Sequence, residues 1–439
     1  MLNKSAAKAI TEKLTSYVSH YATVNIMSSN QGTTRFANSE ISQNIAISDT
    51  SVSLTVYDGK KEATCTTNVL TDEGLKQLAT DAQTLLAYVP EGEFEAFKLP
   101  KESAAERPPS GELGKAFDQT ARAAFIKEGV SHVEEGFYTA GALVLNQQSI
   151  SVGDSEGAFR YANLEQVSFN TVVTHADGTA GAGECTSYTT APDVIGEFKK
   201  VQATAKAAMG AIEPELGAHT VVLSPTAFAD LVSFMGFTMG ASAIETGTSF
   251  AVGKQGQKLF GENFTVKDDV NCPCSMPVFF DYEGTTRQPV TLVDKGVVTS
   301  FLYDNKLAAR AKAQNTGHAI SNKGQGAYPL HIQVEGGSQS LDEIIAATEK
   351  GIFINEFHYT NFVNPKTLQL TGLTRNGTFL IENGKLTKPI ATVRFTESLL
   401  DAFSKITAIS KERKLIAGYR GAALVPGARI EGFHFTSKP

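Results

Sequence analysis

The clearest periodic pattern in the chain lies near its middle, over residues 226–238 (TAFADLVSFMGFT). Ser224 and Pro225 precede this segment, and the apolar run 220–223 (TVVL) precedes them. A serine at the N-cap and a proline at the first helical position both favour a helix start. The pattern therefore predicts a buried strand that leads into a capped helix. Apolar residues at spacings of three and four share one face of that helix: Phe228, Leu231, Val232 and Met235.

Similar patterns predict a mixture of strands and helices along the rest of the chain. The strand predicted at 51–57 alternates apolar and polar residues, which is typical of a sheet covered on one side. The spacing of Ser340 and Glu343 is that of a capping box, which predicts a helix start there. Further helices are predicted at 5–19, 71–87, 192–209 and 397–409, and further strands at 23–28, 41–47, 290–293 and 301–303 and within 129–188. The fold class predicted is α+β.

Chain length predicts more than one domain. The chain has 439 residues, which is too long for a single compact core. We predict an N-terminal α+β domain over 1–210 and a C-terminal α+β domain over 211–439. The charged, proline-bearing segment 91–111 is predicted to be a surface loop or a boundary within the first domain.

Composition and charge exclude several classes of function. The formal net charge is −7 with both signs interspersed, whereas proteins that bind nucleic-acid backbones need clustered lysine and arginine. No apolar run approaches the roughly 18 residues of a membrane-spanning helix, and lysines interrupt the first 20 residues. Four cysteines in so long a chain do not indicate a disulfide framework. We expect a cytoplasmic protein that binds neither nucleic acid nor a membrane.

Local catalytic motifs are weak. Cys272-Pro273-Cys274 offers two thiols without a second pair or nearby histidines. Such a pair more often consists of structural loop cysteines than of a metal or redox site. The polar residues of Glu356-Phe357-His358 share a strand face, as ordinary surface positions do. The glycines of 178–183 suit hairpins better than a phosphate loop. Ser5 and Lys8 match S-x-x-K but lack its companion motifs.

Longer segments carry a more specific signal. They are residues 247–269, 280–310 and 315–317 and above all GTFLIENGKLTKPI at 377–390. With SISVGDSEGAFRY and SVSLTVYDGKKEATCTTNVL upstream, they resemble the TldD/PmbA family, long called modulators of DNA gyrase and assigned to the zinc metalloproteases. The resemblance covers most of the chain in order. It implies two mixed sheet-and-helix domains of the TldD/PmbA type.

The resemblance also implies where a metal site would lie. In TldD, the catalytic branch, a His-Glu-x-x-x-His segment follows a Val-Val-Leu strand; its histidines bind zinc and its glutamate acts as general base. Counting from Val221–Leu223 places these positions at Ser233, Phe234 and Thr238. Serine and threonine are poor zinc ligands, and phenylalanine cannot accept a proton. TldD's third ligand is a C-terminal cysteine, and no cysteine follows Cys274 here.

These losses imply the partner branch, PmbA (also called TldE), with no catalytic residue, no metal and no cofactor of its own. Asn364-Pro365 also resembles that branch, although Leu368-Gln369 replace its usual Gly-Asp. The resemblance implies a heterodimer with a TldD-like catalytic subunit that degrades or processes peptides. The peptide would lie extended and add to a sheet edge. The sequence does not indicate which residues contact the peptide.

Two alternatives remain open at this point. The first is a homo-oligomeric peptide-binding or structural protein, for example a homodimer, that acts without TldD. The second is a metallopeptidase with an unrecognised site, at Cys272 and Cys274 or at His318 and His331.

Overall fold

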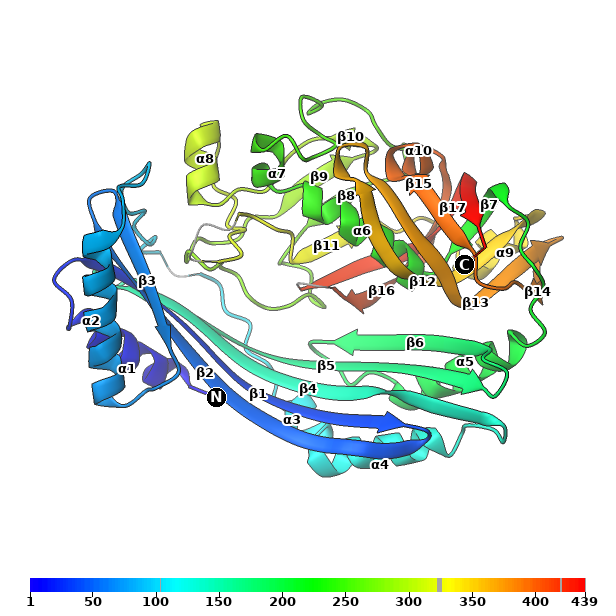
Figure 1. Cartoon of the computed structure of the whole chain (residues 1–439), viewed down its shortest axis with the longest axis horizontal. Coiled ribbons are helices and arrows are strands. Elements are labelled where there is room, and N and C mark those ends of the chain that lie inside the picture. The colour runs from blue at the N-terminus through cyan, green and yellow to red at the C-terminus, as the bar shows by residue number, and fades with distance from the viewer. Residues whose placement is uncertain (103, 322–325, 419–420, 439) are drawn as a thin grey trace.

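The computed structural model describes residues 1–102, 104–321, 326–418 and 421–438. It has the predicted α+β architecture, with one sheet of six strands and one of eleven. In Figure 1 the long strands of the first sheet form a curved band, and the C-terminal half lies against its concave side. Among the described helices, none is both long and apolar enough to cross a membrane.

The first sheet is antiparallel throughout, in the order β3-β2-β1-β4-β5-β6. Its strands are β1 Tyr21–Ala37, β2 Glu40–Asp58, β3 Lys61–Thr67, β4 Phe137–Asp154, β5 Phe159–His175 and β6 Ala180–Ser187. Five helices accompany it: α1 Lys4–Thr15, α2 Asp72–Tyr88, α3 Glu112–Ala116, α4 Gln119–Val130 and α5 Val194–Ala207.

The second sheet is mixed, because β7 runs parallel to β12 and β11 runs parallel to β17. Its strands are β7 Gly217–Leu223, β8 Val266–Asp268, β9 Val290–Asp294, β10 Val297–Val298, β11 His331–Val334, β12 Lys350–Asn364, β13 Gln369–Glu382, β14 Lys385–Pro389, β15 Arg394–Ser398, β16 Ile406–Ala417 and β17 Ala422–Ser437. Its helices are α6 Pro225–Thr238, α7 Ala241–Glu245, α8 Asn305–Ala311, α9 Leu341–Ala346, α10 Leu399–Ser404 and the 3₁₀ turn η1 Pro365–Thr367.

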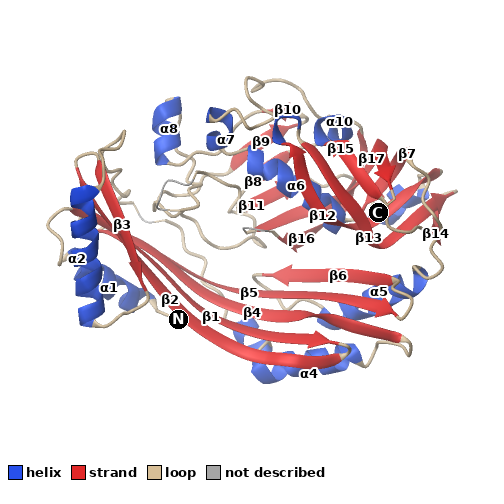
Figure 2. Cartoon of the chain, in the orientation of Figure 1, coloured by secondary structure: helices blue, strands red, loops and turns tan. Residues whose placement is uncertain are grey.

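The two faces of the first sheet have different partners, because side chains alternate along each strand. On β5, Val167 and Phe169 belong to a core shared with α3, α4 and α5. Leu164, on the opposite face, belongs to a core shared with Val278 and Phe280 of the C-terminal half. Figure 2 shows α4 along the outer side of the band, away from the C-terminal half. Anything bound between the two halves therefore meets only one face of this sheet.

Most predicted elements are confirmed, and two are wrong. The predicted helix 397–409 ends at Ser404, because the β-branched segment from Ile406 pairs with β17 as β16. The predicted strand 301–303 is only an isolated bridge between Leu302 and Gly240. The prediction also lacked α3 and α4, and it broke β1 and β2 into short pieces. The domain boundary after residue 210 stays a prediction, although the strands of the two sheets do not interleave along the chain.

Candidate functional site

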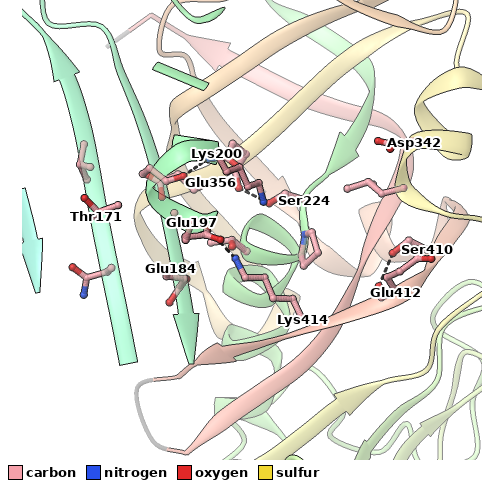
Figure 3. Close-up of a pocket in the computed structure, with 18 of the residues that line it drawn as sticks. Thr171, Glu184, Glu197, Lys200, Ser224, Asp342, Glu356, Ser410, Glu412 and Lys414 are labelled. Atoms are coloured by element: carbon pink, nitrogen blue, oxygen red, sulfur yellow. Dashed lines mark hydrogen bonds and ion pairs between the residues drawn. The ribbon is translucent and has the colours of Figure 1, made fainter. Parts of the chain in front are cut away.

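A polar cleft lies between the edge of the first sheet and the C-terminal half. Its volume is about 640 Å³. It is lined by β5 and β6, by α5, by the starts of α6 and α9 and by β12 and β16. Figure 3 shows its polar side chains: Thr171, Glu184, Glu197, Lys200, Ser224, Asp342, Glu356, Ser410, Glu412 and Lys414.

Strand β6 forms one wall of this cleft and is the last strand of its sheet. Two of its glycines let α5 pack closely behind it. A Cβ on Gly181 would lie 2.6 Å from the backbone nitrogen of Ala205, and one on Gly183 would lie 2.3 Å from Glu197 Oε1. Only Gly178, with φ +91°, serves the hairpin turn that the sequence had suggested for this glycine run.

The free edge of β6 directs main-chain groups toward the C-terminal half. The carbonyl of Ala182 accepts a hydrogen bond from Asn355 Nδ2 of β12 at 3.0 Å, so it points away from β5. Main-chain groups alternate in direction along an antiparallel strand, and the β5–β6 register is unbroken. Glu184 and Thr186 therefore also turn their N–H and C=O groups outward. Among the described residues, no second strand pairs with β6.

Two acidic side chains of the cleft, on β6 and β12, are influenced by each other and by a third acid nearby on α6. The pKa of Glu356 on β12 is raised to about 7: burial is the main cause and the charges of Glu184 and Asp230 add to it, while a hydrogen bond from Asn376 opposes the rise. Burial likewise raises the pKa of Glu184 on β6 and that of Asp230 on α6. Desolvation disfavours the charged form of each acid. The cluster therefore binds protons more readily than free carboxylates do.

One lysine balances part of this negative charge. Lys414 Nζ of β16 lies 3.3 Å from Glu197 Oε1 of α5, and it opposes the rise in the pKa of Glu184. Figure 3 shows Lys414 reaching from β16 toward Glu197, across the space between the two halves of the chain. The cleft thus offers both signs of charge beside an open strand edge.

Helix α6 begins in the cleft and carries the positions that the resemblance assigns to zinc. Ser224 caps it as predicted: its Oγ accepts from the Ala227 N–H at 3.1 Å and donates to the Asn355 carbonyl. Ser233, Phe234 and Thr238 follow two to four turns later, and none of them lines the cleft.

The residues at these positions do not fit a zinc ion. The Thr238 hydroxyl donates to the Met235 carbonyl at 2.7 Å, within its own helix. The Phe234 ring packs edge-on against Phe362, with ring centroids 5.1 Å apart. Zinc sites use thiolate, imidazole and carboxylate ligands. No group of three such side chains placed to hold a metal occurs among the described residues.

The alternative site at His318 and His331 is a buried polar cluster. The structure brings the two histidines together at Asp268: His318 Nε2 lies 3.0 Å from Asp268 Oδ1, and the His331 main-chain N–H donates to Asp268 Oδ2 at 2.8 Å. All three side chains are at most 1% exposed. Despite burial, the two histidines hold the pKa of Asp268 well below its usual range. This cluster has the features of an internal structural network.

The cysteine pair is close in space as well as in sequence. Cys272 Sγ and Cys274 Sγ lie 3.2 Å apart. Arg107 donates to the Cys272 carbonyl at 3.1 Å, which fixes the loop to the N-terminal half. Burial and the neighbouring thiol raise the pKa of Cys274 to about 11, so this thiol stays protonated at neutral pH.

Sequence reasoning missed most of the cleft. The sequence pattern indicates an ordinary surface position for Glu356, and it does not single out Glu184, Lys414 or the neighbouring Asp230. No local motif joins these residues, because each comes from a different element. The available signals were acids in otherwise apolar or glycine-rich segments, such as Asp230 within TAFADLVSF and Glu184 within AGAGECTS.

Comparison with known proteins agrees with the family that the longer sequence segments resemble. The family model of the PmbA/TldA metallopeptidase C-terminal domain matches residues 216–437, just over half of the chain. The model of PmbA/TldA metallopeptidase domain 1 matches residues 22–85. The chain belongs to the PmbA/TldD metallopeptidase family. The resemblance stated from the sequence is therefore confirmed.

Individual relatives are distant in sequence but close in fold. An uncharacterised protein of Methanocaldococcus jannaschii is 29% identical over 48% of this chain and 49% of its own length, and a metalloprotease of the same organism is 25% identical over 38% of each. The chain thus spans about half the length of these curated relatives or less. The crystal structure of TldE from Thermococcus kodakarensis is similar with a TM-score of 0.87 at 18% identity, over 98% of this chain and 99% of that one. That likeness is one of fold.

Proposed function

We propose that this chain is the non-catalytic partner subunit of a TldD-type zinc metalloprotease that degrades or processes peptides. The observation that carries the proposal is the pairing of an open strand edge with an incomplete metal site. β6 presents outward main-chain groups in a polar cleft. In addition, α6 is a helix that carries Ser233, Phe234 and Thr238 at the positions that the resemblance assigns to the ligands and base of the catalytic branch.

The cleft suits recognition of peptide main chains. An extended peptide that adds to β6 would pair with the outward N–H and C=O groups of Glu184 and Thr186. Such pairing recognises main-chain groups more than side chains, which suits a protease of broad sequence preference. The partner's zinc would then perform hydrolysis, and this chain would complete the chamber around the peptide.

Hydrolysis of an unstructured peptide tests the proposal. The peptide is incubated with this chain alone, with a TldD-like subunit alone, and with both at equal concentration. We expect cleavage in the mixture at a rate well above that of either subunit alone. Cleavage by this chain alone would overturn the proposal, and elemental analysis would then show whether that activity depends on bound zinc.

A second candidate is a homo-oligomeric peptide-binding protein that acts without TldD. The observation that favours it is the free edge of β2: β3 pairs only with residues 52–58 of that strand. The rest of β2 exposes Ile41, Ile45 and Ile47 on one face, and such an edge can pair with a second copy. Peptide binding by a dimer of this chain, with no rate increase on adding a TldD-like subunit, would favour this candidate.

A further inference from the structure

A second cavity, of about 300 Å³, lies beyond the cleft on the same face of the first sheet. Residues 170–172 of β5 and 410–414 of β16 line the cleft, whereas residues 164–166 of β5 and 417–418 at the end of β16 line the second cavity. Strands advance about 3.3 Å per residue, so the two cavities follow each other within roughly 15–20 Å. An extended chain along β6 could reach both.

The wall of this second cavity is mostly apolar. The two halves of the chain contribute Ile150, Leu164, Tyr188, Met276, Val278 and Phe280. Tyr188 follows the end of β6 and is only 5% exposed. The line of outward main-chain groups on β6 therefore leads directly to this cavity. Ligand pockets typically combine such an apolar wall with a few placed polar groups.

Arg287 provides an unsatisfied donor in that wall. Its side chain is 3% exposed, and its Nε donates to the Phe280 carbonyl at 3.3 Å. Its Nη1 has no hydrogen-bond partner among the described residues. The nearby Asp281 carboxylate does not bond Nη1; its oxygens accept main-chain N–H groups instead, those of Glu283 and Thr285 at Oδ1 and that of Ala319 at Oδ2. A buried donor without a partner is costly and indicates a missing acceptor.

We propose that this cavity binds one large apolar side chain of an extended peptide, and that Arg287 Nη1 donates to a carbonyl of the same peptide segment. The proposal rests on the proposed function, in which the peptide main chain lies along β6. The apolar wall selects a residue such as phenylalanine or leucine. The extended main chain supplies the acceptor that Arg287 lacks. The cavity would thereby add a preference for one large apolar side chain to the recognition of the peptide main chain by β6.

Binding of labelled hexapeptides to the full chain tests this proposal. One peptide carries a single phenylalanine among glycines, and its control carries serine instead. By fluorescence anisotropy we expect the phenylalanine peptide to bind at least about tenfold more tightly, as an apolar pocket discriminates. A phenylalanine peptide in which the carbonyl of that residue is reduced to a methylene should lose about tenfold in affinity, because a charged donor loses its acceptor.

Ala417→Trp should fill the cavity and prevent a side chain from binding there, since Ala417 lines the cavity and is itself exposed. It should abolish the preference, so that the phenylalanine and serine peptides bind with equal affinity. Ala176→Trp, on an exposed turn outside the cavity, is the control and should keep the preference. If thermal melting shows that Ala417→Trp does not fold, Gln166→Trp fills the cavity from the opposite wall.

The outcomes separate this proposal from the function beneath it. Equal affinity for both peptides, or an unchanged preference in the blocked variant, overturns the apolar site while peptide binding stands. An unchanged affinity for the reduced peptide overturns the role of Arg287. Failure of both peptides to bind, together with no gain in hydrolysis on mixing with a TldD-like subunit, overturns the proposed function and the apolar site with it.

Discussion

At the scale of single residues, the most unusual feature of the cleft is the raised pKa of the Glu356 carboxyl group. A carboxyl group that titrates near pH 7 can exchange a proton at physiological pH, whereas an exposed glutamate is ionised throughout that range. Glu356 is in this state because burial outweighs its hydrogen bond from Asn376 and its attraction to Arg375. The negative charges of Glu184 on β6 and Asp230 on α6 also raise its pKa. Stability of this region should therefore depend on pH.

Glu356→Gln should reveal that dependence. The folded-state pKa of about 7 lies above the unfolded value of 4.5, so the protonated form contributes stability that is complete below pH 4.5 and lost as pH rises through 7. Glutamine keeps an acceptor for Asn376 and cannot ionise. In urea titrations the variant should exceed the native chain by about 1–3 kcal/mol at pH 8.5 and match it near pH 4.5. An equal difference at both pH values would contradict this interpretation of Glu356. Glu412→Gln, at an exposed position of the same cleft, is the matched control.

At the scale of elements, the direction of main-chain groups on β6 decides which substitutions the strand tolerates. Proline removes an N–H, which an edge strand accepts only on its open side. Thr186 turns its N–H outward, whereas Cys185 pairs with Phe169 of β5. Thr186→Pro should leave the thermal midpoint nearly unchanged and weaken peptide binding severalfold in anisotropy measurements. Cys185→Pro should unfold the edge of the sheet; equal thermal midpoints for the two variants would mean that the assigned strand direction is wrong.

How far the sequence predicted each element depends on where its signal lies. The strand and helix around α6 were predictable in detail, since Ser224, Pro225 and the Phe228–Met235 stripe are local signals, and the family resemblance located Ser233, Phe234 and Thr238 on that helix. The segment after Lys405 was not predictable, because its helical spacing was overridden by long-range pairing with β17. The cleft escaped prediction for the same reason, as its acids meet only through tertiary structure.

At the scale of the whole molecule, the two halves are joined along their length. Lys306 pairs with Glu62 and Arg310 with Glu93 at one end of the curved sheet, and Lys414 pairs with Glu197 toward the other. Such surface ion pairs contribute little individually. The apolar cluster between the sheets, which includes Leu164, Val278 and Phe280, contributes more because it removes large side chains from water. Since this cluster also borders the second cavity, the bound peptide and the domain interface would share one set of contacts.

Phe280→Ala tests whether that interface couples the two halves. Phe280 is 2% exposed, and removing a buried phenylalanine ring costs about 3–5 kcal/mol. If the halves unfold together, hydrogen exchange should accelerate by a similar factor in the most protected amides of β4 and of β12, although only one half carries the substitution. The control is Phe198→Ala, which removes a ring from the outer core between α5 and the first sheet, away from the interface. Acceleration confined to β12 in the Phe280 variant would show that the halves unfold independently. The cleft between them could then open without global unfolding, and a peptide could enter by separation of the two halves.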